Sequence, residues 1–132
     1  MTQSAATVRD TGPGRLAVEV ATGGQSFPGD EPVTAGGTGL GPSPYDLLCA
    51  ALAECTTLTL RLYADRKAWP LQAIEVAVEH AREAAETPPD VFHRAIRLEG
   101  SLDGAQRDRL LQIAERCPVH RTLAAGARVV TG

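Results

Sequence analysis

A long apolar segment begins at residue 43 and reads SPYDLLCAALAECTTL over residues 43–58. Ser43 suits a helix N-cap, Pro44 suits the first helical position, and Asp46 follows the cap by three residues. The pattern therefore predicts a helix that runs to about Lys67 and stops before a Trp-Pro pair. Its first half is apolar nearly all round, which predicts burial on every side. A chain of 132 residues can scarcely provide that burial alone, so we expect a second subunit to help cover the helix.

Strand-like and helical patterns flank this segment. Outside this segment, the residue pattern predicts strands at residues 6–10, 16–20, 74–80, 92–99 and 127–131. A short strand is expected at Val33, inside the Gly- and Pro-rich connection 23–41. Helices are expected at 104–116 and 118–125. The strands at 74–80 and 92–99 should form an antiparallel hairpin. Together these elements predict a single α+β domain over residues 1–132, an antiparallel sheet packed with a long central helix and a second helix that carries a cysteine.

The composition excludes several classes of function. A net charge of −3 gives no general attraction to nucleic acid or to anionic membranes. The apolar run is interrupted by Glu54 and Arg61, so no membrane span is expected. The first residues lack the basic and apolar parts of a secretory signal, which predicts a cytoplasmic location. Three cysteines in a reducing compartment are reactive or buried, and they lack the spacing of a zinc site, so neither a metal nor another cofactor is expected.

Two cysteines lie in settings of opposite kind. Cys55 lies in the middle of the apolar helix, whereas Cys117 comes directly before Pro118, where a helix should begin. A helix N-terminus lowers the pKa of a thiol, which favours Cys117, and His120 lies within one turn of it. Cys55 lies in the middle of a helix, so lowering its pKa requires a cation or a hydrogen-bond donor from elsewhere. The two thiols are a plausible redox pair; the alternative is that both are small core residues. Cys49 is interpreted as a core residue.

Helix geometry restricts which groups can assist Cys55. Asp46 precedes Cys55 by nine positions, about 13.5 Å along the axis at ~1.5 Å per residue and about half a revolution round it. On a straight helix the two cannot touch, so any such pairing must use a bend or cross to another subunit. The same holds for a cation from Arg15 or Arg9. Asp46 fits equally well as the acid of a capping box.

One arginine occupies an unusual position. Arg94 lies on the same face of its predicted strand as the apolar residues Phe92 and Ile96. A paired arginine, or one whose stem is buried while its head reaches water, explains that placement.

Four segments carry a resemblance to a known family. They are GPSPYDLL (41–48), AALAECT (50–56), YADRK (63–67) and CPVH (117–120), with a similar lead-in at residues 30–37. In this order they resemble the OsmC/Ohr family over roughly residues 15–131. The resemblance implies an intertwined α+β fold that exists as an obligate homodimer, with active sites at the subunit interface.

The resemblance also implies a chemistry. It implies a thiol peroxidase that reduces organic hydroperoxides in defence against oxidative stress: Cys55 attacks the peroxide, becomes a sulfenic acid and is resolved by Cys117, and a dithiol or lipoylated protein reduces the disulfide. Hydroperoxidases of the family place a glutamate directly after the helix-initial proline, where it organises an arginine at the thiol. Here that position is Tyr45 and the acid follows as Asp46, with Arg15 the first choice of arginine and Arg9 the second.

A second hypothesis belongs to another class of protein. It is a non-catalytic dimer that binds an apolar or thiol-containing small molecule, or senses redox state, with slowly reacting cysteines. Tyr45 in place of the acid favours this hypothesis, whereas the presence of both Cys55 and Cys117 favours the peroxidase.

Overall fold

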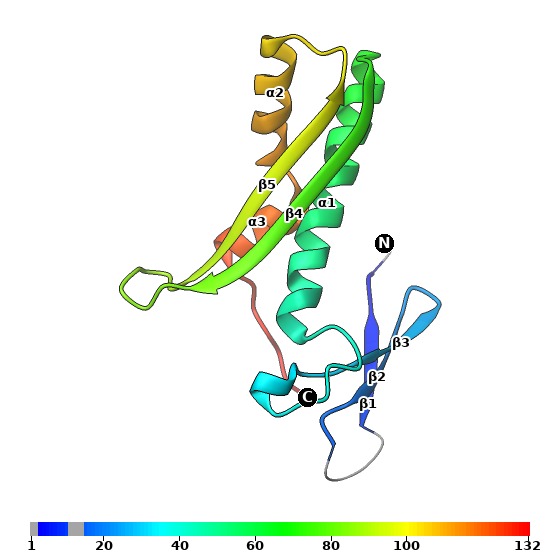
Figure 1. The fold of residues 1–132 in the computed structure, drawn as a ribbon, viewed down its shortest axis with the longest axis vertical. Helices are drawn as coiled ribbons and strands as arrows, with labels where there is room; N and C mark the ends of the chain where they lie inside the picture. The colour runs from blue at the N-terminus through cyan, green and yellow to red at the C-terminus, as the bar shows by residue number, and fades with distance from the viewer. Residues whose placement is uncertain (1–2, 11–14) are drawn as a thin grey trace. The chain divides into compact units, whose positions relative to one another are not determined.

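The computed structural model describes residues 3–10 and 15–132. The chain forms two compact units, residues 1–48 and residues 49–132, which we call the N-terminal and C-terminal units. Helix α1 (Pro44–Lys67) begins in the first unit and continues into the second (Figure 1).

The N-terminal unit contains a three-stranded antiparallel sheet. Its strands are β1 (Ala6–Asp10), β2 (Val18–Thr22) and β3 (Gln25–Gly29), in that spatial order. Gly23 and Gly24 connect β2 to β3 with φ values of 57° and 76°, the left-handed conformation that a two-residue hairpin turn requires. A short 3-10 helix, η1 (Val33–Ala35), follows in the connection to α1.

A buried carboxylate holds that connection together. Oδ1 of Asp30 accepts a hydrogen bond from the Glu31 N–H at 2.7 Å. Oδ2 accepts from the Thr38 hydroxyl at 2.7 Å, and from the N–H groups of Thr38 and Leu40, each at 3.2 Å. The side chain thus replaces the backbone pairing that a loop lacks.

Helix α1 begins as the sequence predicts. The Ser43 N–H donates to Asp46 Oδ2 at 2.9 Å, and the Asp46 N–H donates to Ser43 Oγ at 3.2 Å, which is a reciprocal capping box. The helix ends at Lys67, where Ala68 takes a φ of 54° and the Trp69 N–H donates back to the Ala64 carbonyl at 2.9 Å.

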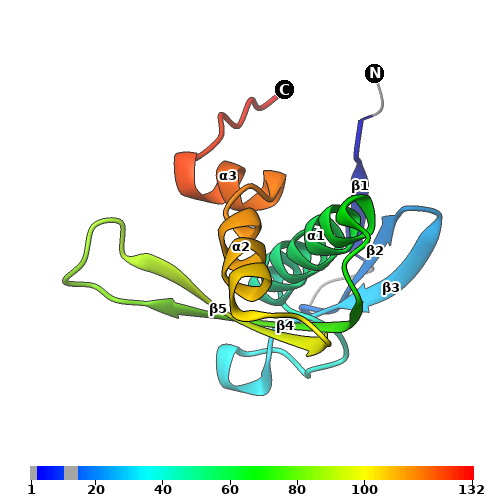
Figure 2. The same cartoon turned by 90° about the horizontal axis from the view of Figure 1, so that it is seen from above.

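The C-terminal unit packs helices on one face of a long hairpin. Strands β4 (Leu71–Arg82) and β5 (Asp90–Gly100) pair antiparallel, and α2 (Gly104–Ala114) and α3 (Pro118–Ala125) follow. Figure 2 shows α1 and α2 on the same side of this hairpin. The buried core comes from α1, β4 and α2, and partly buried residues of β5 pack against it. The core residues are Leu60, Ala64, Leu71, Leu110, Ile113 and Ala114.

Several predictions about elements were wrong, whereas the α+β class with antiparallel sheets is confirmed. Residues 127–131 form no strand: Val129 and Val130 are 91% and 85% exposed, and in the described residues no strand pairs with them. Val33 begins a 3-10 helix because it lies between Pro32 and a glycine pair instead of beside a pairing strand. Strand β3 was not predicted, since Gln25–Gly29 lacks a clear apolar alternation.

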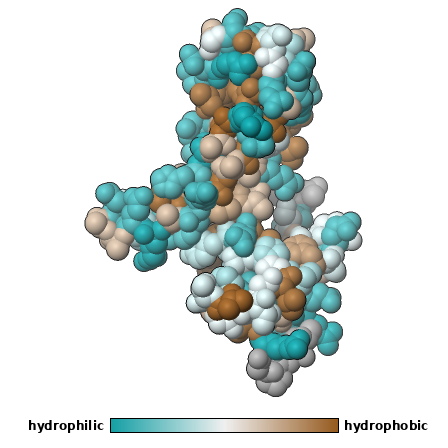
Figure 3. Space-filling model, viewed as in Figure 1, coloured by the Kyte–Doolittle hydropathy of each residue, from teal (hydrophilic) through white to brown (hydrophobic). Residues whose placement is uncertain are grey.

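The single chain buries one face of α1, so burial on every side stays a prediction that depends on a second subunit. The buried residues of α1 form one stripe at a spacing of four: Leu52, Thr56, Leu60 and Ala64. Leu58 and Leu62, on another face, are 54% and 57% exposed. Apart from α1, Figure 3 shows brown, hydrophobic residues at the surface among teal ones over the part that Figure 1 labels α2, β4 and β5.

By length and composition alone α1 could cross a bilayer, although the sequence had not been expected to contain such a segment. The same composition suits a helix that supplies one wall of a core, and Leu60 and Ala64 are fully buried in this one. Arg61 donates to the Leu71 carbonyl at 2.6 Å, which ties the helix to β4.

Candidate active site

The structure brings the two predicted thiols into contact. Within the C-terminal unit, Cys55 on α1 and Cys117 before α3 share a hydrogen bond between their sulfurs. Cys117 is the N-cap of α3, with Pro118 in the first turn. Its Sγ accepts a hydrogen bond from the His120 N–H at 3.5 Å, and the Val119 N–H bonds to both sulfurs. The sulfurs therefore lie against the positive end of a helix.

Helix α1 supplies the remaining polar contacts of the thiol pair. Thr59, one turn after Cys55, bonds to the Cys55 sulfur through its side chain. Thr56 bonds to the Cys117 sulfur in the same way. Thr56 and Cys117 have no exposed surface, whereas Cys55 is only half-buried.

The surroundings shift the pKa values of the two thiols in opposite directions. Burial raises the pKa of the Cys55 thiol, and its contact with the Cys117 sulfur raises that pKa further. Burial also acts to raise the pKa of Cys117, but hydrogen bonds from Cys55, from the N–H groups of His120 and Val119, and from the Thr56 side chain outweigh it and lower that pKa. The surroundings of the pair therefore favour the proton on Cys55 and negative charge on Cys117, which agrees with the helix-start setting of Cys117.

Only Cys55 opens to the outside. A hollow of about 320 Å³ lies over it, lined by residues of α1 and one residue of α3: Ala51, Glu54, Cys55, Leu58, Thr59, Leu62 and Val119. The walls are largely apolar, and the hollow is wide open. A small apolar molecule can thus reach the Cys55 sulfur directly, whereas it would have to pass Cys55 or part the helices to reach Cys117.

Two residues near the pair escaped functional assignment in the sequence. Arg94, on β5, donates through Nη1 to Thr56 Oγ1 at 3.0 Å and to the Ala114 carbonyl at 3.3 Å. Thr56 reads in sequence as one more small residue of an apolar helix. The position of Arg94 on an apolar strand face was the available signal, but it did not reveal which groups the guanidinium meets.

The other predicted site residues have different surroundings. Asp46, Arg15 and Arg9 belong to the N-terminal unit. There Asp46 closes the capping box with Ser43, Arg15 is exposed before β2, and Arg9 lies on β1. Their assignment to the thiol site remains a prediction. Cys49 is a free, half-buried thiol on α1.

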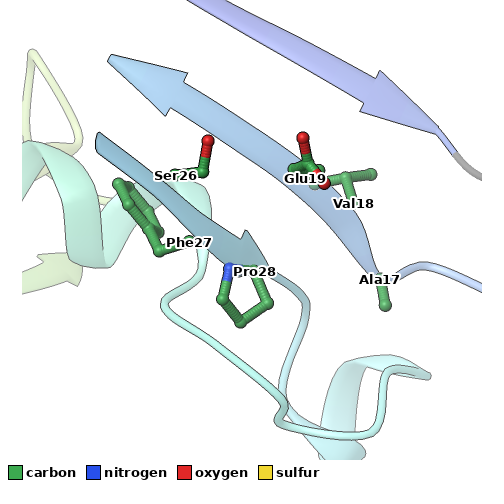
Figure 4. A pocket seen from close by; sticks show the side chains of 6 residues that line it. All are labelled: Ala17, Val18, Glu19, Ser26, Phe27 and Pro28. Atoms are coloured by element: carbon green, nitrogen blue, oxygen red, sulfur yellow. The ribbon is translucent and has the colours of Figure 1, made fainter. Parts of the chain in front are cut away.

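The N-terminal unit has a hollow of its own. It measures about 360 Å³ and is lined by Ala17, Val18, Glu19, Ser26, Phe27 and Pro28, from β2, β3 and the residue before β2 (Figure 4). None of these side chains is a thiol or an imidazole. Across residues 3–10 and 15–132, no three His, Cys, Asp or Glu side chains gather in a way that could hold a metal ion.

A comparison with protein families finds one match. The model of the family described as OsmC-like protein matches residues 37–131, which contain both thiols, α1 and the β4–β5 hairpin. The chain belongs to the OsmC-like family. No curated protein matches it.

Solved structures of the family share the fold at low sequence identity. An organic hydroperoxide resistance protein OsmC from Legionella pneumophila is 20% identical, with a TM-score of 0.70, covering 93% of this chain and 90% of that one. The organic hydroperoxide resistance protein OhrB of Bacillus subtilis is 22% identical, with a TM-score of 0.62 and coverages of 92% and 90%. An osmotic stress and detoxification response protein from Psychrobacter arcticus is 24% identical, with a TM-score of 0.72 and coverages of 92% and 88%.

Proposed function

We propose that this chain is a thiol-dependent peroxidase that reduces organic hydroperoxides, with Cys55 as the attacking thiol and Cys117 as the resolving thiol. The observation that supports it is the hydrogen bond between the two sulfurs, one open to a hollow and the other held at a helix N-terminus. Two of the solved relatives are organic hydroperoxide resistance proteins.

The hydrogen bond between the thiols supports a specific first step. As the Cys55 sulfur attacks the outer peroxide oxygen, its proton passes to the Cys117 sulfur. The O–O bond breaks, Cys55 becomes a sulfenic acid, and the alkoxide takes a proton from solvent and leaves as the alcohol. Cys117 thus acts first as the base, a role that its lowered pKa favours.

The second step joins the two sulfurs. Cys117 attacks the sulfur of the Cys55 sulfenic acid, the S–S bond forms, the S–O bond breaks, and the hydroxyl leaves as water with the Cys117 proton. A dithiol or a lipoylated protein then reduces the disulfide by thiol exchange. Because the sulfurs already share a hydrogen bond, the second step requires little movement of α1 or α3.

The proposal includes a homodimer. Leu58 and Leu62 flank the hollow over Cys55 and leave more than half of each side chain exposed. Leucines one turn apart on a helix form a continuous apolar strip. A second subunit covering this strip would enclose the hollow and turn it into a channel for an alkyl hydroperoxide.

Thiol counting tests the proposal. One equivalent of cumene hydroperoxide should remove two thiols per chain rapidly in the parent and in Cys49→Ser, which lacks the third thiol of α1. Cys55→Ser should abolish the rapid reaction. Cys117→Ser should slow the attack, because the base of the first step is lost, and the Cys55 sulfenic acid that does form should persist and be trapped by dimedone. Oxidation of the parent at the rate of free cysteine would reject the proposal.

A non-catalytic dimer that binds an apolar or thiol-containing molecule, or senses redox state, is the second candidate. The observation that favours it is the raised pKa of Cys55, because a protonated thiol attacks peroxides slowly. Under this candidate, the parent would bind the small molecule but would not consume hydroperoxide with added dithiol.

A further inference from the structure

A nearly buried arginine lies beside the thiol pair. The Arg94 side chain is 11% exposed, and its nearest anion, Oε1 of Glu115, is 4.0 Å from Nη2. Glu115 itself is 65% exposed, so solvent screens much of its charge. Burying a guanidinium whose charge is only weakly balanced by a carboxylate is unfavourable unless hydrogen bonds to nearby groups offset the lost hydration.

Two of those hydrogen bonds lead to Cys117 by separate routes. The first passes through Thr56, whose Oγ1 accepts from Arg94 and whose side chain bonds to the Cys117 sulfur. The second passes through the Ala114 carbonyl, which accepts from Arg94 and also, at 3.3 Å, from the Cys117 N–H. One guanidinium group therefore contacts the partners of both the backbone and the sulfur of Cys117.

The Thr56 hydroxyl has one hydrogen to donate, and its oxygen accepts a hydrogen bond from Arg94. That hydrogen points to the Leu52 carbonyl at 2.7 Å in the structure. Arg94 occupies one of the two acceptor lone pairs of this oxygen. When the hydrogen turns from the Leu52 carbonyl to the Cys117 sulfur, the hydroxyl meets that sulfur as a donor, the direction in which its hydrogen bond lowers the pKa of Cys117. A donor stabilises a thiolate, whereas an acceptor would stabilise a protonated thiol.

We infer that Arg94 is a positioning residue of the thiol pair: through Thr56 and the Ala114 carbonyl it holds the Cys117 sulfur against Cys55 as an anion. The inference deepens the proposed function and rests on it only for its consequence in catalysis. Of the charged and titratable groups in the printed contacts around Cys117, Cys55 on α1 and the His120 N–H on α3 bond to its sulfur. Arg94 on β5 contacts Thr56 and the Ala114 carbonyl, and Glu115 at the end of α2 lies beside Arg94 and His120. Glu115 Oε2 lies 3.1 Å from His120 Nε2, so these two groups form a separate pair at the outer side.

The test titrates the thiols without any peroxide. In a Cys49→Ser background, the ultraviolet absorbance of thiolate is followed against pH for the parent, Arg94→Met, Arg94→Lys, Thr56→Val and Thr56→Ser. Because the two sulfurs interact, the first step of the titration belongs to the pair. Arg94→Met and Thr56→Val should each shift that step upward by roughly one pH unit, the size typical of losing one donor to a thiolate. Arg94→Lys and Thr56→Ser should restore much of it.

Arg97→Met is the matched control. Arg97 lies on the same strand, but its side chain is 66% exposed and pairs with Glu75, so its loss should leave the first titration step unchanged. Arg94→Met should still fold, because Thr56 keeps the Leu52 carbonyl and Ala114 keeps the Cys117 N–H as partners. Urea unfolding of each variant confirms this.

Two outcomes separate the inference from the proposed function. If Arg94→Met titrates like the parent and Arg97→Met, the inference is overturned, whatever the enzyme activity. If the step shifts as expected but the parent does not consume cumene hydroperoxide with dithiol, the proposed function fails and the role of Arg94 stands.

Discussion

At the scale of single residues, the two thiols divide the work between access and charge. Cys55 faces the hollow but holds its proton, whereas Cys117 is buried and is favoured as the anion. Neither sulfur alone combines exposure with negative charge. The proposed peroxidase therefore depends on proton transfer between them, which explains why a direct hydrogen bond matters more here than the setting of either cysteine.

Asp46 has two proposed roles, capping α1 and assisting the thiols, and substitutions can distinguish them. Its carboxylate accepts from the Ser43 N–H in the capping box, so Asp46→Ala should lower the free energy of unfolding by about 1 kcal/mol. Asp46→Asn keeps an acceptor and should recover most of that loss. Urea unfolding measures both. If Asp46→Asn leaves stability intact but slows disulfide formation strongly, the carboxylate serves the thiols and capping is not its main role.

The sequence indicated the thiols and the cap more readily than the residues around them. Cys117 before Pro118, and Ser43 three residues before Asp46, are local patterns with a direct structural meaning. Thr56 and Arg94 are 38 positions apart and meet only because β5 packs on α1. No local pattern encodes that contact, so the oddity of an arginine on an apolar face was visible while its partner was not.

At the scale of elements, the connection between β3 and α1 depends on one carboxylate. Hydrogen bonds from the Thr38 hydroxyl, and from the N–H groups of Leu40, Glu31 and Thr38, lower the pKa of Asp30 although burial opposes them. A depressed folded pKa means that the contribution of Asp30 is present above its ordinary value of 3.8 and is lost as the pH falls through the folded pKa.

Amide hydrogen exchange should show this dependence. Thr38 and Leu40 should be protected at neutral pH and lose their protection factors as Asp30 becomes protonated, whereas the amide of Val20 in the sheet should keep its own. Asp30→Asn should weaken the protection of Thr38 and Leu40 at neutral pH, because the amide offers one carbonyl oxygen for four donors. Equal protection in parent and variant at neutral pH would show that the loop does not need the carboxylate.

The elements themselves were largely predictable where a pattern is long. The 24 residues of α1 and the β4–β5 hairpin have sustained periodicity and clear boundaries, and both were predicted. Predictions for short segments failed in both directions: residues 127–131 carry two valines without forming a strand, and β3 forms without a clear apolar alternation. In a segment of only five residues, the presence of a neighbouring strand to pair with outweighs the intrinsic β-propensity of the residues.

At the scale of the whole molecule, the exposed apolar strip of α1 predicts association. Leu58→Glu with Leu62→Glu should shift the sedimentation of the protein from about twice the chain mass to the chain mass, because burying two carboxylates in an apolar interface is unfavourable. The matched Leu58→Met with Leu62→Met variant should remain a dimer. A parent protein that sediments as a stable monomer would contradict the dimer.

The central claim is that a hydroperoxide joins Cys55 to Cys117 within one chain. Peptide mapping by mass spectrometry after one equivalent of cumene hydroperoxide tests it most directly. The account predicts one dominant disulfide-linked pair of peptides, carrying Cys55 and Cys117, with Cys49 still reduced. A disulfide to Cys49, a Cys117–Cys117 link between chains, or no disulfide at all would contradict it.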